Sequence, residues 1–200
     1  FKILDIGKKI TICPVWEKES ETDRIVFKIN PGMSFGTGTH HSTKMCIEEL
    51  ENIINPGDEV LDIGCGSGIL SIVSLLLGAD NATALDIDPN CVHIAYENAA
   101  LNNIYKDKYT VLSGNVLSDK SLFKKISVKK YDVVEANIIA DVIIALAPMA
   151  AKLTKKGGTF ITSGIIINRA DEVEEALKKY FAIERIKQSG EWISIVCKNQ

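Results

Sequence analysis

The sequence predicts an α/β protein with a mostly parallel β-sheet and helices on both of its faces. Three observations support this fold class. From residue 59 onward, short apolar segments alternate with segments of helical periodicity, and this alternation is typical of parallel sheets. A glycine-rich turn at 64–68 follows the first of these strands and opens the first helix. The last two strand segments are separated only by Ser189-Gly190 and should pair antiparallel.

The first thirty residues differ from the rest of the chain. Two segments, 9–16 and 24–30, are expected to be strands joined by a charged turn. We therefore predict N-terminal strands at 1–30 that lead into a single domain spanning 31–200.

A loop and a helix are expected to follow these strands. Residues 31–42 are rich in Gly, Thr and His, which indicates a loop. Apolar residues recur toward one side over 43–54, which predicts a helix, and Asn55-Pro56-Gly57 should end it.

The regular part of the chain should contain seven strands and four helices. The predicted strands are 59–63, 82–87, 110–114, 131–138, 158–163, 182–188 and 191–198. The predicted helices are 69–77, 89–101, 141–153 and 169–180. Asp88 and Asn168 should cap the second and fourth helices, and Pro148 should kink or split the third. The lysine-rich stretch 120–130 is expected to be a solvated loop.

Composition narrows the class of protein. The 23 basic and 26 acidic residues give a net charge of −3, which argues against a surface that grips nucleic acid throughout. The apolar stretch 69–77 is about half as long as a membrane span, and no signal peptide is expected. The five cysteines lack Cys-x-x-Cys spacing, which indicates reduced thiols and a cytoplasmic location. The histidine spacing predicts no metal site.

The glycine turn is the most informative motif. Its glycines are Gly64, Gly66 and Gly68, so the third comes one residue earlier than in a dinucleotide fingerprint. Asp62, two residues before the first glycine, would repel a pyrophosphate but suits a positively charged ligand. S-adenosylmethionine carries an ammonium and a sulfonium group and no phosphate. We therefore predict Asp62, Gly64 and Gly66 as cofactor-binding residues, and the alternative of a nicotinamide dehydrogenase is disfavoured.

A second acidic residue fits the same cofactor. Asp86 ends the second strand of the alternating region, 22 residues after Gly64. A carboxylate at that place accepts hydrogen bonds from ribose hydroxyl groups. Asp88 is the competing candidate, but its position before Pro89 suits a helix cap better.

The chain resembles a known family in several motifs. Asp-x-Gly-x-Gly-x-Gly after a strand resembles motif I of the class I methyltransferases. Phe-Gly-Thr-Gly-Thr-His at 35–40, followed by Thr43, resembles the ribosomal protein L11 methyltransferases, the PrmA family. The segments 132–141 and 14–16 are similar to the same family. The resemblance implies a Rossmann-like class I methyltransferase fold with a seven-stranded sheet and an antiparallel C-terminal strand pair.

The resemblance also implies a site and a substrate. The family's cofactor-binding positions correspond to Thr43, Gly64, Asp86 and Asn137. The implied acceptors are amines of a large-subunit ribosomal protein, both lysine ε-amines and the N-terminal α-amine, carried to the trimethyl state. Neither direct nucleic-acid binding nor membrane association is expected.

Asn137 is the candidate catalytic residue. Methyl transfer to an amine demands alignment, exclusion of water and a neutral acceptor, and Asn137 offers a polar group near the acceptor nitrogen. Related enzymes that act on planar groups have Asn-Pro-Pro-aromatic here, whereas Asn137 is followed by Ile138 and Ile139, which favours a flexible alkyl amine.

Several alternatives stay open. The chain could methylate RNA or a small molecule, or hold the cofactor without catalysis. Glu135 occupies a strand position where the family usually has an apolar residue, and a buried carboxylate needs a partner. It is either a local peculiarity or a group that faces the cleft and assists an amine.

Overall fold

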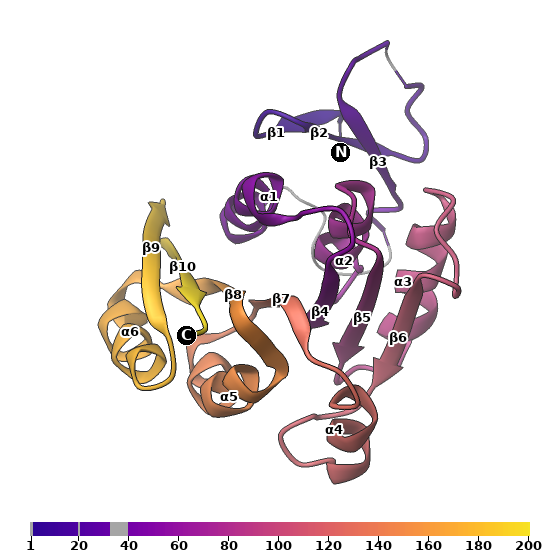
Figure 1. The fold of residues 1–200 in the computed structure, drawn as a ribbon. Helices are drawn as coiled ribbons and strands as arrows, with labels where there is room; N and C mark the ends of the chain where they lie inside the picture. The colour runs from indigo at the N-terminus through magenta and orange to yellow at the C-terminus, as the bar shows by residue number, and fades with distance from the viewer. Residues whose placement is uncertain (1, 20, 33–39) are drawn as a thin grey trace.

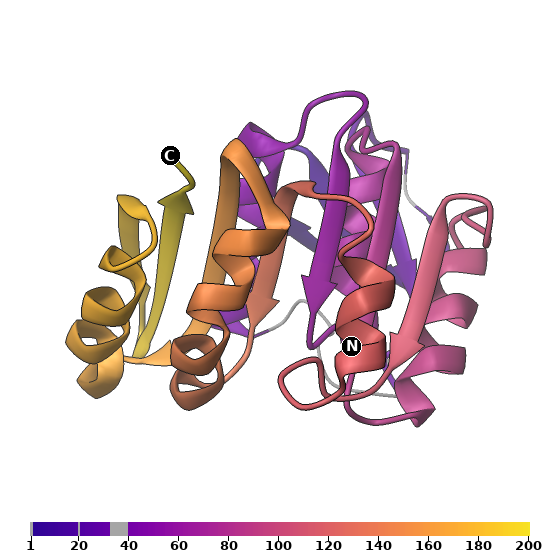
Figure 2. The same ribbon diagram turned by 60° about the horizontal axis from the view of Figure 1, so that its bottom comes forward.

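The computed structural model describes residues 2–19, 21–32 and 40–200 and contains two β-sheets, the larger flanked by helices (Figures 1 and 2). The strands are β1 (Leu4–Ile6), β2 (Ile10–Pro14), β3 (Ile25–Ile29), β4 (Glu59–Ile63), β5 (Asn81–Asp86), β6 (Tyr109–Ser113), β7 (Tyr131–Asn137), β8 (Thr154–Ile166), β9 (Ala182–Ser189) and β10 (Trp192–Lys198). The helices are α1 (His41–Ile53), α2 (Ile69–Leu76), α3 (Asn90–Ala100), α4 (Lys120–Ile126), α5 (Ala140–Leu153), the 3-10 helix η1 (Ile167–Arg169) and α6 (Ala170–Lys178).

The larger sheet has seven strands in the order β6-β5-β4-β7-β8-β10-β9. The first five pair parallel, and β10 pairs antiparallel with both β8 and β9. This confirms the predicted α/β class and the antiparallel C-terminal pair. The chain runs outward from β4 to β6 and returns beside β4 with β7, which creates a topological switch point where ligands bind in such sheets.

Helices cover both faces of this sheet. Helices α1, α2 and α3 lie on one face and α4, α5 and α6 on the other (Figure 1). Val60 of β4 packs in one core with Ile72 and Ala95, whereas its neighbour Leu61 packs in a second core with Ile143. Successive strand residues point to opposite faces, so central strands that are apolar at nearly every position must be covered on both sides.

The small N-terminal sheet packs onto α1. Its strands β2 and β3 pair parallel, and β1, which the sequence did not predict, pairs antiparallel with β2. Glu51 of α1 accepts hydrogen bonds from the amides of Lys8 and Lys9, both at 2.9 Å. Arg24 Nη2 donates to Ile10 O at 2.7 Å. Ile10 is fully buried in the same core as α1 and α2, so both apolar packing and hydrogen bonds hold this sheet in place.

The prediction of a loop at 120–130 was wrong, because residues 120–126 form α4. Asp119 Oδ1 accepts a hydrogen bond from Leu122 N at 3.0 Å and caps the helix. Leu122 and Ile126 are buried, while Lys120, Lys124 and Lys125 are exposed. A helix this short draws its stability from the buried pair and the cap.

The expectation that Pro148 could split a helix and the expectation that Asn168 caps one were also wrong. Pro148 lies inside α5 without splitting it, because the buried Ala147 and Ala150 keep that turn packed against the core. Asn168 does not cap α6; it lies in η1. The start of α6 is held instead by Arg169, whose guanidinium pairs with Asp141 at 2.6 Å.

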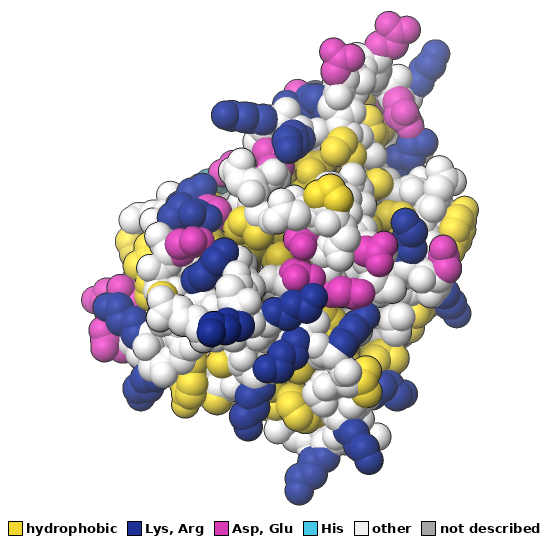
Figure 3. Space-filling view, viewed as in Figure 1, with side chains coloured by type: hydrophobic (Ala, Val, Ile, Leu, Met, Phe, Trp, Pro, Cys, Tyr) yellow, Lys and Arg dark blue, Asp and Glu magenta, His cyan; other side chains and the backbone are white. Residues whose placement is uncertain are grey.

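The charged surface is mixed. Basic and acidic side chains are interspersed on the face shown in Figure 3, with lysines projecting around α4 at its lower end. Among the residues that the structure describes, no helix is both long and apolar enough to cross a membrane.

Candidate functional site

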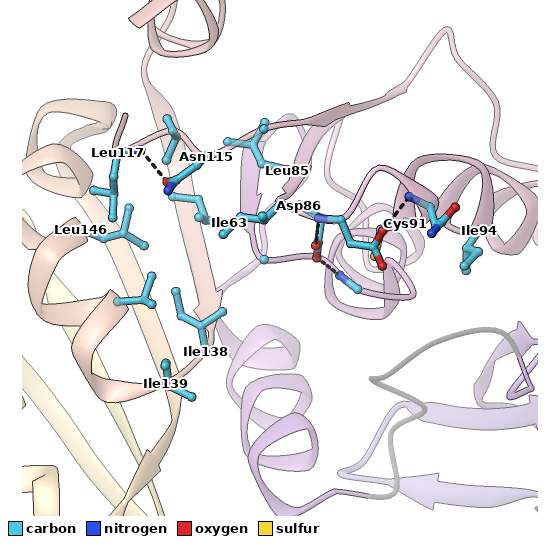
Figure 4. A pocket seen from close by; sticks show the side chains of 18 of the residues that line it. Ile63, Leu85, Asp86, Cys91, Ile94, Asn115, Leu117, Ile138, Ile139 and Leu146 are labelled. Carbon is cyan, nitrogen blue, oxygen red and sulfur yellow. Dashed lines mark hydrogen bonds between the residues drawn. The ribbon is translucent and has the colours of Figure 1, made fainter. Parts of the chain in front are cut away.

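A cavity of about 970 Å³ opens at the carboxyl ends of β4, β5, β6 and β7 (Figure 4). The glycine turn and Asp86 contribute to one side of it, and apolar residues that include Leu117, Ile139 and Leu146 line the other. Its position at the topological switch point is the usual place for a ligand in this class of fold.

The glycine turn forms one wall because its backbone adopts conformations that side chains disfavour. Gly64, Gly66 and Gly68 have φ of 80°, 53° and 84°, values that glycine accepts without steric cost. The amides of Gly64 and Cys65 donate to Leu85 O at 2.8 and 2.9 Å, which fixes the turn against β5. Gly64 and Gly66 both line the cavity, and their contact with a cofactor stays a prediction.

Replacing Gly68 with alanine should destabilise the protein by about 2–4 kcal/mol, since positive φ and crowding both add to the cost. A Cβ there would lie 2.7 Å from Tyr109 Oη and 3.1 Å from Ala95 Cβ. Urea denaturation measures the change. Gly57→Ala is the matched control: its φ is 88°, but a Cβ would meet open space, so it should lose only about 1 kcal/mol. Equal losses in the two variants would show that crowding at Gly68 is unimportant.

Asp86 joins the glycine turn to the residues that follow β5. Its Oδ2 accepts from Gly66 N and its Oδ1 from Asp88 N, both at 2.9 Å. Burial raises the pKa of Cys91 to about 12, and the carboxylates of Asp86 and Asp88 add to that shift. Asp88 also lines the cavity, and its Oδ1 accepts from Asn90 N at 2.9 Å. This bond braces the start of α3, but the N-cap of the helix is Pro89 and not Asp88 as predicted.

Asp62 lies beneath the turn rather than on the cavity wall. It is 1% exposed, and its Oδ2 accepts from Ser71 N of α2 at 3.2 Å. It is not among the described residues that line the cavity. Its contact with a cofactor stays a prediction, and the structure shows it bracing the helix that follows the turn.

Asn137 and Thr43 form a polar pair next to the cavity. Asn137 Nδ2 donates to Thr43 Oγ1 at 3.2 Å, which brings together residues from the ends of β7 and the start of α1. Thr43 is buried. Neither lies among the described lining residues, but Ile138, which directly follows Asn137, does. Ile138 packs over the turn, since a Cβ on Gly64 would lie 2.5 Å from its Cγ2.

The histidine loop is described only at its end. Residues 33–39, which hold most of the Phe-Gly-Thr-Gly-Thr-His motif, lie outside the described residues. His40 Nδ1 accepts from Ser42 N at 3.1 Å and caps α1. His93 lies exposed on α3 at the rim of the cavity.

Sequence reasoning missed the residues that follow β6. Asn115, Val116 and Leu117 line the cavity, and Asn115 Oδ1 accepts from Leu117 N at 3.1 Å. The available signal was Gly114-Asn115 directly after a parallel strand, a position that always reaches the carboxyl edge of the sheet. Ile87 and Ile139, 67% and 65% exposed, add apolar surface at the rim.

The chemistry of the lining indicates the kind of ligand. Two carboxylates, from Asp86 and Asp88, contribute to the wall, and no lysine or arginine occurs among the described lining residues. A pyrophosphate would meet negative charge there without a cation to balance it. A nucleoside fits, with its ribose on Asp86 and its base against apolar side chains, and so does a positively charged group. S-adenosylmethionine combines these features. Within the described part of the chain, no cluster of three His, Cys, Asp or Glu could hold a metal.

Comparison with known proteins gives a consistent result. The family described as "Ribosomal protein L11 methyltransferase (PrmA)" matches residues 1–200. The chain is 46% identical over 201 residues to a ribosomal protein L11 methyltransferase of Thermoanaerobacter sp. (strain X514) and covers 62% of its length. It is 43% identical to the protein of the same name from Listeria monocytogenes, of which it covers 60%. The chain therefore spans about three fifths of these relatives.

Solved structures are similar too. A ribosomal protein L11 methylase from Lactobacillus delbrueckii subsp. bulgaricus matches over the full length of both chains, with a TM-score of 0.89 and 29% identity. The N-methyltransferase NodS from Bradyrhizobium japonicum, solved with S-adenosyl-l-homocysteine, matches 80% of this chain and 89% of its own, with a TM-score of 0.61 and 12% identity. The second similarity concerns the fold alone.

Proposed function

The chain belongs to the ribosomal protein L11 methyltransferase (PrmA) family, and from this premise we propose that it transfers methyl groups from S-adenosylmethionine to amines of ribosomal protein L11. The proposed acceptors are lysine ε-amines and the N-terminal α-amine. The observation that carries the proposal is the cavity wall formed by the glycine turn and Asp86, next to the Asn137–Thr43 pair.

The residues of the cavity have distinct proposed roles. Asp86 accepts hydrogen bonds from the ribose hydroxyls, and its bond to Gly66 N holds the turn at the same time. Asn115 and the apolar residues near it enclose the adenine. When bound, S-adenosylmethionine supplies a methyl carbon activated by the sulfonium group.

The acceptor side is assigned to Asn137, whose amide donates to Thr43 Oγ1. The amine must arrive neutral, although a free lysine with a pKa of about 10.4 is almost fully charged at neutral pH. Asn137 carries no charge, so it does not stabilise the ammonium form as a carboxylate would. Ile138, which packs over the glycine turn, helps to exclude water from the line of attack, and the ammonium proton leaves to solvent. In the transfer, the nitrogen lone pair forms a bond to carbon as the carbon–sulfur bond breaks.

Titration calorimetry and a transfer assay test this function. We expect the chain to bind S-adenosylmethionine and S-adenosylhomocysteine and to give no heat with NAD. With purified L11 and labelled S-adenosylmethionine, label should enter the protein at lysines and at the N-terminus, located by mass spectrometry. Binding of NAD alone would overturn the proposal. Transfer to RNA instead of L11 would reject the substrate while keeping the cofactor.

The proposal includes a cytoplasmic location for this reaction. All five cysteines are free and buried, as expected for a protein that folds in a reducing compartment.

A further inference from the structure

Two buried carboxyl groups lie on neighbouring strands of the larger sheet, on the face that α2 covers. Asp62 of β4 and Glu135 of β7 are register partners in adjacent parallel strands. Each is 1% exposed, and each contacts a serine of α2: Ser71 for Asp62 and Ser74 for Glu135. Neither side chain is among the described residues that line the cavity.

The hydrogen bonds around Ser74 indicate which carboxyl group carries a proton. Ser74 Oγ lies 2.8 Å from Leu70 O and 3.3 Å from each carboxyl oxygen of Glu135. A hydroxyl group has one hydrogen, and the shorter distance places it on Leu70 O. The Ser74 hydroxyl therefore offers Glu135 only a long, shared hydrogen bond, so Glu135 lacks a strong donor that would stabilise its charged form.

The bonds around Asp62 favour its charged form. The amide of Ser71, in the first turn of α2, donates to Asp62 Oδ2, and a carboxylate is favoured near the positive end of a helix. Ser71 Oγ lies 2.7 Å from Tyr109 Oη. If Tyr109 donates in that bond, the Ser71 hydroxyl hydrogen is free to donate to Asp62 or to Gly68 O, 3.1 Å away.

The surroundings oppose two negative charges at this place. Burial raises the pKa of both Asp62 and Glu135, and the Asp62 carboxylate raises that of Glu135 further. The titratable groups that act on or with the pair are Cys46 of α1, Cys65 of the turn, Asp86 of β5 and Tyr109 of β6. None of these four groups is a cation, so a retained proton is what balances the pair.

Charge in the cavity also changes how tightly the pair holds its proton. The carboxylate of Asp86 contributes to the cavity wall and raises the pKa of Asp62. A positive charge bound in the same region acts with the opposite sign and favours loss of a proton.

We propose that Asp62 and Glu135 hold one proton between them, carried by Glu135. Binding of the positively charged cofactor causes a fraction of the molecules to release this proton to solvent. The pair acts by positioning: Asp62 stays the acceptor for Ser71, which fixes the glycine turn. The release half of the proposal rests on the proposed function, because that function supplies the positive charge.

The unfolding free energy of the ligand-free protein tests the shared proton alone. An acid whose folded pKa lies above its unfolded pKa loses stability as pH rises between the two values. Wild-type stability should therefore fall, relative to Glu135→Gln, as pH increases above the ordinary glutamate range of about 4.3. Parallel curves would overturn the shared proton. Glu135→Leu repeats the test if the glutamine variant does not fold.

Glu49→Gln is the matched control, because Glu49 is equally buried. Burial opposes its charge, yet its bonds to Arg185 and Lys187 lower its pKa. The stabilising contribution of the Glu49 carboxylate to the free energy of unfolding should therefore be lost at acid pH, as pH falls toward the lowered pKa. A Glu49→Gln curve that reproduced that of Glu135→Gln would argue against a special role for the pair.

Calorimetry in two buffers of different ionisation enthalpy tests the release. Wild type should release more protons on binding S-adenosylmethionine than on binding S-adenosylhomocysteine, which lacks the sulfonium charge. In Glu135→Gln the two ligands should differ only by the protons that the ligands themselves lose. Between pH 6 and 8, the affinity ratio of the two ligands should change about threefold more in wild type than in the variant, equal to half a pKa unit of coupling. Equal proton release in both proteins would overturn the coupling.

If neither ligand binds, the proposed function fails. The stability curves then still show whether Asp62 and Glu135 share a proton.

Discussion

Replacing Asp86 with alanine is expected to lower the affinity for S-adenosylmethionine about 100-fold, with the fold intact. The carboxylate is proposed to accept bonds from both ribose hydroxyls, and charge-assisted hydrogen bonds contribute about 1.5–3 kcal/mol each. A loss of about 3 kcal/mol corresponds to about 100-fold in affinity. The variant also removes the acceptor for Gly66 N, so the turn loses one restraint. Calorimetry gives the affinity, and circular dichroism checks the fold.

Two further variants separate the roles of this region. Asp86→Asn keeps an oxygen acceptor for Gly66 N but loses the charge, so it should fall between wild type and alanine. Asp88→Ala removes the neighbouring carboxylate and its hydrogen bond to Asn90 N at the start of α3, and it should reduce stability by about 1 kcal/mol with little effect on affinity. If Asp88→Ala lost affinity and Asp86→Ala did not, the ribose assignment would belong to Asp88.

The central sheet could be predicted from sequence because its signals are local. The predicted strand 59–63 coincides with β4, since a short apolar run between a Pro-Gly stop and a glycine turn leaves little choice of boundary. The turn itself, the start of α3 after Asp88-Pro89 and the antiparallel C-terminal pair follow from residue types a few positions apart. These features place Gly64, Gly66 and Asp86 together at the cavity without knowledge of tertiary contacts.

The features that sequence did not predict depend on distant contacts. The parallel pairing of β2 with β3 and the existence of β1 depend on Glu51 and Arg24, which bind backbone atoms from other parts of the chain. Helix α4 depends on burial of Leu122 and Ile126 in a core built by other elements. The partner of Glu135 could not be known either, because Ser74 and Asp62 become its neighbours only after the sheet and α2 assemble.

Replacing Asn137 with alanine should reduce the rate of methyl transfer about 100-fold at saturating cofactor, while the affinity for S-adenosylmethionine changes much less. Removing one preorganised polar group from an active site typically costs about 100- to 1,000-fold in rate. The Asn137 amide is held in place: its Nδ2 donates to Thr43 Oγ1, and its Oδ1 lies over Gly164, where a Cβ would come within 2.9 Å. Single-turnover transfer to L11 measures the rate separately from binding.

Two neighbouring variants decide whether the effect belongs to Asn137 itself. Thr43→Val removes the bond that orients the amide but leaves Asn137 present, so an intermediate loss of rate is expected. Ser163 is the register partner of Asn137 in β8, and its Oγ donates to Ser42 O at the start of α1 at 3.0 Å. Ser163→Ala deletes this bond and leaves the Asn137–Thr43 bond in place. It should stay within a few-fold of wild type. A drop in Ser163→Ala as large as in Asn137→Ala would mean that the packing of α1 on the sheet limits the rate. Full turnover in Asn137→Ala would remove Asn137 from the acceptor site, and the groups that align the amine would then have to lie elsewhere around the cavity.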